Sequence, residues 1–117
     1  MIKIDFDIPE KVSTNKFYAG THWRVRKSIV DTWHEYVSLI ALEGNFEPIK
    51  AYPVTVSYVF TFKTRALDTL NCAAMAKMAE DAIVRVGILE DDSPKFVNES
   101  CILVEKGKRD KLEIIIT

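Results

Sequence analysis

Acidic residues on either side of one amphipathic segment are the side chains of this chain best suited to chemistry. Asp68 stands before the segment, and three successive acids follow it in the stretch VGILEDDSPKFV: Glu90, Asp91 and Asp92. Neighbouring carboxylates repel one another, and a bound cation relieves that repulsion. Mg²⁺ takes oxygen ligands from a few carboxylates, and it can activate water and stabilise a phosphoryl transition state. These acids therefore form a candidate site for a divalent cation.

Structural roles explain the same residues. Asp68 is a natural helix N-cap, and EDDSP consists of residue types that solvated turns prefer. Lys77, Asp81 and Arg85 follow one another at i,i+4 spacing, so they can form exposed ion pairs worth a few tenths of a kcal/mol. Alternatively, the Lys77 ammonium could lie near a bound phosphate. Spacing alone favours the structural roles over the catalytic ones.

Other kinds of catalytic site find little support in the sequence. The chain has no GxSxG motif and no phosphate-binding glycine loop. Cys72 and Cys101 lie in apolar contexts without metal-ligand spacing, so both are expected to be buried, reduced thiols of a cytosolic protein. His22 and His34 do not form a metal pair. We expect His34 at the surface or its boundary, and His22 in a basic loop.

Charge is segregated along the chain although the formal net charge is only -1. Residues 11–27 include five basic side chains and no acid, and two further basic groups follow at 63–65 and in KGKRDK near the end. Acids gather at 80–92. Such a distribution predicts local binding of a polyanion together with an acidic pocket for a cation.

The composition is that of one folded domain spanning residues 1–117. Hydrophobic residues make up 48% of the chain, which is enough for one core at this length. No apolar run reaches the roughly 18 residues that a membrane span needs, and no signal-peptide pattern opens the chain. We therefore expect a cytoplasmic protein without a membrane segment.

Hydrophobic periodicity predicts an α+β single domain in the order β-α-β-α-β-β, with one mixed sheet covered by two helices. The segment 9–23 is expected to be an ordered loop. The predicted strands and helices are a strand at 2–8, a helix at 28–43, a strand at 52–63, a helix at 69–86, and strands at 95–105 and 111–117. Asp68 should cap the second helix, and Gly87 should end it.

Two stripes of apolar residues predict which faces are buried. The first lies on one face of the strand 52–63 and consists of Val54, Val56, Tyr58, Phe60 and Phe62. The second lies along the helix 69–86 and consists of Cys72, Met75, Ala79, Ile83 and Val86. Lys77 lies on the opposite, solvent-facing side of that helix.

Three segments, in this order, resemble the RusA-type Holliday-junction resolvases, small endodeoxyribonucleases common in phages and prophages. PEKVSTNKFYAG is similar to the family's early proline-to-tyrosine loop, with Asn15 and Tyr18 matching. FKTRALDTLNCAAMAKMAEDAIVRVGI is similar to its strand, basic residues, Asp-containing turn and long helix. ILEDDSPKFV is similar to its Asp-Asp pair and following strand. Together these segments reach most of the chain.

The resemblance implies a set of metal-binding and catalytic residues. Asp68 matches one aspartate of the family's Asp-x-Asp-Asn element, and Asp91 or Asp92 matches the later pair. Lys77 matches the catalytic lysine when the alignment is anchored on GILEDD. The chain departs from the family at Ala66, where an aspartate is expected, although a shifted alignment supplies an amide ligand at Asn71.

The function implied is that of a Mg²⁺-dependent endonuclease, with Mn²⁺ able to substitute, that resolves four-way junctions or other branched DNA. Asp68, Asp91 and Asp92 would hold the metal, Asn71 would assist, and Lys77 would stabilise charge on the phosphate. The expected DNA contacts are Asn15, Lys16, Arg24, Arg26, Lys27, Lys63 and Arg65.

Symmetric cutting implies a homodimer, whose interface could use the helices, Trp23 or Trp33. A DNA-junction binding protein that has lost cleavage is the alternative. An unrelated α+β interaction module is a third hypothesis.

Overall fold

The structure is a computed structural model that describes residues 1–117. Its elements, in chain order, are β1 (Ile2–Asp7), α1 (Thr14–Ala19), α2 (Trp23–Glu43), β2 (Val54–Phe62), the 3-10 helix η1 (Thr69–Cys72), α3 (Ala73–Arg85), β3 (Val97–Lys106) and β4 (Lys111–Ile116). The predicted α+β class is confirmed, and each predicted strand is present. None of the helices combines the length and the apolar character needed to cross a membrane.

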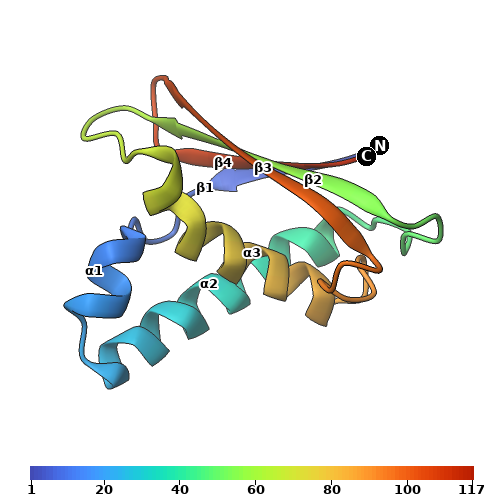
Figure 1. Ribbon diagram of the computed structural model, residues 1–117, viewed down its shortest axis with the longest axis horizontal. Helices are drawn as coiled ribbons and strands as arrows, with labels where there is room; N and C mark the ends of the chain where they lie inside the picture. The colour runs from blue at the N-terminus through green and yellow to red at the C-terminus, as the bar shows by residue number, and fades with distance from the viewer.

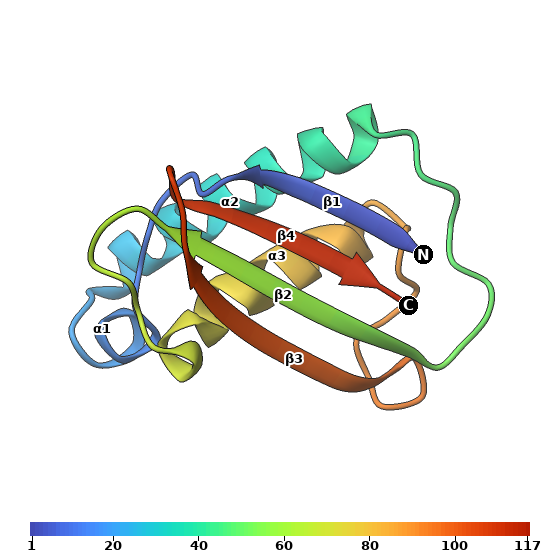
Figure 2. The ribbon, with the colours of Figure 1, turned by 90° about the horizontal axis from the view of Figure 1, so that it is seen from above.

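The four strands form one mixed sheet in the order β1-β4-β2-β3. β4 is antiparallel to both β1 and β2, whereas β2 and β3 are parallel. Parallel neighbours need a crossover connection, and α3 provides it here. The two long helices α2 and α3 lie on one face of the sheet (Figure 1). No helix covers the other face (Figure 2). The expected sheet with two covering helices is therefore confirmed.

The core lies between the sheet and these two helices. The predicted buried face of β2, from Val54 to Phe62, is buried at every second residue. The predicted stripe of α3 is buried at Cys72, Met75, Ala79 and Ile83, while Val86 is only partly buried. Trp33 is fully buried, and its indole N–H donates to the Glu10 carbonyl at 2.9 Å. The expectation that Trp33 could serve a subunit interface is therefore wrong.

The segment predicted as a loop at 9–23 contains the short helix α1. The Ser13 hydroxyl caps it by accepting from the Lys16 N–H at 3.2 Å. Helix α2 also begins earlier than the predicted residue 28, because His22 Nδ1 accepts from the Arg24 N–H at 3.2 Å and caps the helix there. A six-residue helix is too short for its hydrophobic period to be recognised in a sequence.

The two cysteine thiols are free but differ in environment. Cys72 is buried as predicted, and its burial, together with the nearby Asp68 charge, raises the pKa of its thiol to about 11. Cys101 is only partly buried on β3, so the prediction that both thiols are buried is wrong for this residue.

His34 is buried in α2, contrary to the expectation of a surface or boundary residue. Its side chain is 8% exposed, and neither ring nitrogen has a hydrogen-bond partner. Burial lowers the pKa of His34 from its ordinary value, and the Arg85 charge lowers it further. Asp81 and Asp31 act in the opposite direction without reversing the shift.

This burial predicts a pH-dependent stability. Below the ordinary pKa of histidine, about 6.5, the unfolded chain binds a proton that His34 in the folded protein resists. The free energy of unfolding should therefore decrease more steeply between pH 7.5 and pH 5 in the parent protein than in His34→Leu. Urea unfolding at several pH values measures this. The exposed N-cap variant His22→Asn should keep the parent's steeper decrease, and equal slopes in all three proteins would contradict the prediction.

Candidate functional site

Lys77 brings two acidic segments together on the exposed flank of α3. Its Nζ lies 3.1 Å from Asp81 Oδ1 and also contacts Asp92 Oδ2. The bond with Asp92 raises the pKa of Lys77, and the same bond lowers the pKa of Asp92. The predicted i,i+4 pair with Asp81 is confirmed, whereas no ion pair joins Asp81 to Arg85. The loop after α3 therefore folds back along the helix so that Asp92 reaches Lys77.

A buried carboxylate lies next to this ion pair. Glu80 is 9% exposed, and its Oε2 accepts a hydrogen bond from the Tyr58 hydroxyl of β2. Burial raises the pKa of Glu80, while the Tyr58 bond and the Lys77 charge act against that rise. Burial and the Glu80 carboxylate raise the pKa of Tyr58 as well. The pair links the inner side of α3 to the central strand and leaves Lys77 and Glu80 on neighbouring sides of the helix.

A hollow of about 210 Å³ opens between α3 and the edge strand β3 at this point. Its lining comprises Tyr58, Ala73, Ala76, Lys77, Glu80, Ser100 and Ile102. Small alanines leave this space open, and both the ammonium and the buried carboxylate border it. The hollow can therefore present one ammonium and one carboxylate to a molecule that lies against the flank of α3.

Asp68 and Asn71 form a separate pair at the start of η1. Asp68 is an N-cap as predicted, but of η1 and not of α3, which begins only at Ala73. Its Oδ1 accepts from the Asn71 N–H at 3.0 Å, and its Oδ2 accepts from Asn71 Nδ2 at 3.3 Å. The Asn71 amide oxygen accepts from the Asn15 N–H at 3.1 Å. These bonds hold α1 against η1, and they already use the polar atoms of Asn71.

The four predicted metal ligands are not gathered in one place by this chain. Asp68 and Asn71 lie before α3, and Asp91 and Asp92 lie in the loop after it. The helix between them has 13 residues and is roughly 20 Å long. No three His, Cys, Asp or Glu side chains converge closely enough to hold a metal ion. Of the four predicted catalytic residues, the structure brings together Lys77 and Asp92, while Asp91 is exposed beside them.

Two carboxylates of this cluster, Asp81 and Asp92, both contact the Lys77 ammonium. Asp81 and Asp92 each have an oxygen within hydrogen-bond distance of the same nitrogen, so these oxygens can lie at most roughly 6 Å apart. Mg²⁺ commonly takes one or two carboxylates and completes its shell with waters and phosphate oxygens. Sequence reasoning did not name Asp81 among the candidate ligands, although its i,i+4 spacing from Lys77 placed the two side chains on the same face of the helix.

Basic side chains from separate parts of the sequence meet at the end of the sheet where β2 finishes. Lys11 Nζ donates to the Thr64 carbonyl at 2.8 Å, and the Lys63 N–H donates to Asp110 Oδ1 at 2.9 Å. A pocket of about 590 Å³ next to these contacts is lined partly by Lys11, Lys16 and Arg65. Two of the predicted DNA-binding residues, Lys16 and Arg65, thus share one pocket, together with Lys11.

The other predicted DNA contacts lie in different surroundings. Arg24 lies over the Trp23 ring, 5.3 Å from its centre, and both side chains are exposed. Lys27 forms an ion pair with Asp31 at 2.7 Å, so its charge is already partly compensated. Arg26 is partly buried, while Lys63 is exposed next to the basic pocket.

Comparison with models of known protein families gives no match for this chain, and comparison with curated proteins gives none either. The functional roles proposed below therefore rest on the chemistry of the residues and on their arrangement. The Lys77 cluster and the basic end of the sheet are the two features that carry them.

The buried pair of Tyr58 and Glu80 leads to a stability prediction. In Tyr58→Phe, the buried carboxylate loses its only hydrogen-bond donor, which should cost about 1–3 kcal/mol in the free energy of unfolding at pH 7. Denaturant unfolding measures this loss. The matched variant Tyr18→Phe removes a hydroxyl from an exposed ring and should change stability by less than about 0.5 kcal/mol. Equal losses in the two variants would contradict the structural role of the pair.

Proposed function

We propose that this protein is a Mg²⁺-dependent endodeoxyribonuclease that cuts four-way junctions or other branched DNA in recombination and repair. The observation that carries the proposal is the Lys77 ammonium held between Asp81 and Asp92 at an open hollow. The resemblance to RusA-type resolvases adds support, because it assigns catalytic roles to Lys77 and to the later aspartate pair.

Each group has a distinct role in the proposed reaction. Asp81 and Asp92 would hold Mg²⁺ or Mn²⁺, which supplies positive charge beside the scissile phosphate when bound. Lys77 has a flexible side chain that is 52% exposed, so it can turn from Asp92 to a phosphate oxygen. There it would stabilise the negative charge on the non-bridging phosphate oxygens while a water molecule attacks phosphorus and the bond from phosphorus to the leaving sugar oxygen breaks. Glu80, held by Tyr58, would keep the inner flank of the helix in place.

The basic end of the sheet would bind the DNA backbone. Lys11, Lys16 and Arg65 line a single pocket, and Lys63 lies beside it. Neutralising phosphates releases condensed counterions, so binding should weaken steeply as the salt concentration rises. Their positions on a loop, on a short helix and in the bend after β2 are suited to contacting more than one phosphate.

A homodimer is part of this proposal. Cutting a four-way junction symmetrically needs two active sites related by a two-fold axis. Exposed apolar side chains on α2, including Trp23, Leu39 and Leu42, are available for contact between subunits. A measurement of mass in solution with and without junction DNA tests this element separately from cleavage.

A junction-binding protein without cleavage is the second candidate. The separation of Asp68 from the loop acids favours it, and so does Ala66 at a position where the resemblance expects an aspartate. This candidate keeps the basic pocket and assigns the Lys77 ion pairs a structural role only.

A cleavage assay distinguishes the two. In single-turnover reactions on a synthetic four-way junction with Mg²⁺ or Mn²⁺, Asp92→Asn and Lys77→Met should each lower the cleavage rate about 100-fold or more. Their affinity for the junction should change by only a few-fold. Asp5→Asn, an exposed acid on β1 without an ion pair, is the matched control and should cut at the parent rate.

Binding by the parent without nicking in either metal would overturn the nuclease and support the binding protein. Cleavage that survives in both Asp92→Asn and Lys77→Met would overturn the proposed site. Asp68→Asn retains an N-cap and should therefore fold normally, so its cleavage rate reports whether Asp68 acts in the reaction.

A further inference from the structure

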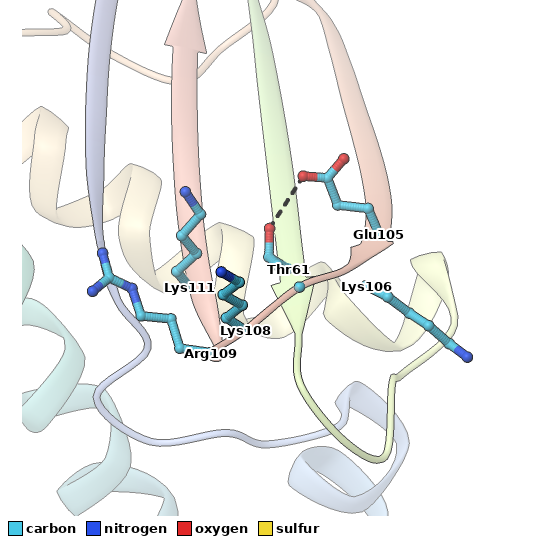
Figure 3. A pocket seen from close by; sticks show the side chains of 7 residues that line it. Thr61, Glu105, Lys106, Lys108, Arg109 and Lys111 are labelled. Carbon is cyan, nitrogen blue, oxygen red and sulfur yellow. Dashed lines mark hydrogen bonds between the residues drawn. The ribbon is translucent and has the colours of Figure 1, made fainter.

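The turn between β3 and β4 carries a second basic hollow, distinct from the pocket of Lys11, Lys16 and Arg65. It has a volume of about 420 Å³, and no hydrophobic residue lines it. Its side chains are those of Thr61, Glu105, Lys106, Lys108, Arg109 and Lys111. Figure 3 shows Lys108, Arg109 and Lys111 rising on one side of the hairpin, while Lys106 points away from them.

Positive charge in this hollow is only partly compensated. Arg109 Nε lies 3.0 Å from Asp7 Oδ1, but no carboxylate lies within ion-pair distance of Lys106, Lys108 or Lys111. Glu105 accepts a hydrogen bond from the Thr61 hydroxyl at 3.3 Å. Lys108, Arg109 and Lys111 therefore gather on one side of the hairpin with a single ion pair among them, and cationic groups crowded in this way repel one another unless an anion binds.

The hairpin backbone is held firmly in position. The Gly107 N–H donates to the Phe62 carbonyl at 3.1 Å, and the Asp110 carbonyl accepts from the Ile8 N–H at 3.1 Å. A Cβ atom at Gly107 would come within 2.2 Å of a Thr61 methyl group, so only glycine allows this close approach. The Asp110 carboxylate accepts from the Lys63 N–H at 2.9 Å. The lysines are thus presented from a fixed turn.

The hollow also adjoins the basic end of the sheet. Asp110 connects the hairpin to the segments around the first pocket. Its carboxylate accepts from the Lys63 N–H and lies 4.0 Å from Lys11 Nζ. Figure 2 shows the β3–β4 turn at the same end of the sheet as α1 and the segment after β2. A chain of phosphates that occupies the first pocket could therefore continue onto the hairpin.

We infer that the β3–β4 hairpin is a second phosphate-binding surface, in which Lys108 and Lys111 contact the sugar–phosphate backbone of DNA. This inference rests on the proposed DNA-binding function. Since the hollow has neither aromatic nor aliphatic lining, it cannot stack bases, and contact with the backbone alone is independent of sequence.

Salt-dependent binding tests this site. The double variant Lys108→Ala, Lys111→Ala should bind a synthetic four-way junction roughly tenfold or more weakly at 100 mM salt. The slope of log affinity against log salt should become shallower by about 2, since each lost phosphate contact contributes about 0.9. The control Lys50→Ala, Lys95→Ala changes the charge equally but removes exposed lysines before β2 and before β3, at the other end of the sheet. It should bind as the parent does.

The outcomes distinguish a failure of the hairpin site from a failure of the proposed function. If the parent binds DNA and the hairpin variant binds equally well, the hairpin site is overturned and the proposed function stands. Equal losses in the hairpin and control variants would indicate a general charge effect and would also overturn the site. If the parent itself retains no DNA at low salt, both the site and the proposed function fall. Thermal unfolding of each variant verifies that it is folded.

Discussion

The Lys77 ammonium is the group on which the acidic face of this protein depends. Asp81 and Asp92 contact it directly, and its charge also favours ionisation of the buried Glu80. Without that ammonium, Asp81 and Asp92 would lie close together with no compensating charge, and the loop after α3 would lose one of its contacts with the helix. A bound cation could take over the same role, which is why the arrangement is compatible with a metal-assisted reaction.

The crossover from β2 through α3 to β3 supplies the framework for this interaction. Its parallel strands and packed helix fix the flank of α3 relative to the edge of the sheet, and the Tyr58–Glu80 bond joins the two layers. The same sheet gathers basic segments at one end through contacts of Asp110 with the chain around Lys63. Acidic and basic regions are therefore held on one scaffold.

Local features of the fold were predictable because the responsible residues are neighbours in sequence. The alternation in β2 and the positive φ of Gly87 after α3 follow the prediction. Asp68 is an N-cap as expected, although it caps η1 and not α3. The i,i+4 pair of Lys77 and Asp81 belongs to the same class. Helix α1 was missed because six residues give no recognisable period, and the burial of His34 was missed because a polar residue gives no apolar signal.

The sequence by itself determined the strands, the two long helices and the clustering of charge, since each arises from interactions over a few residues. Only the tertiary structure decided which acids meet. It brought Asp92 into contact with Lys77 and Glu80 into contact with Tyr58. Asp68 is instead bonded to Asn71, before the N-terminus of α3. These pairings depend on how the loop after α3 returns and how the helix packs on the sheet. Periodicity along the chain predicts which face of a helix or strand is buried. It does not predict the path of the loop or which residues of another element that face contacts.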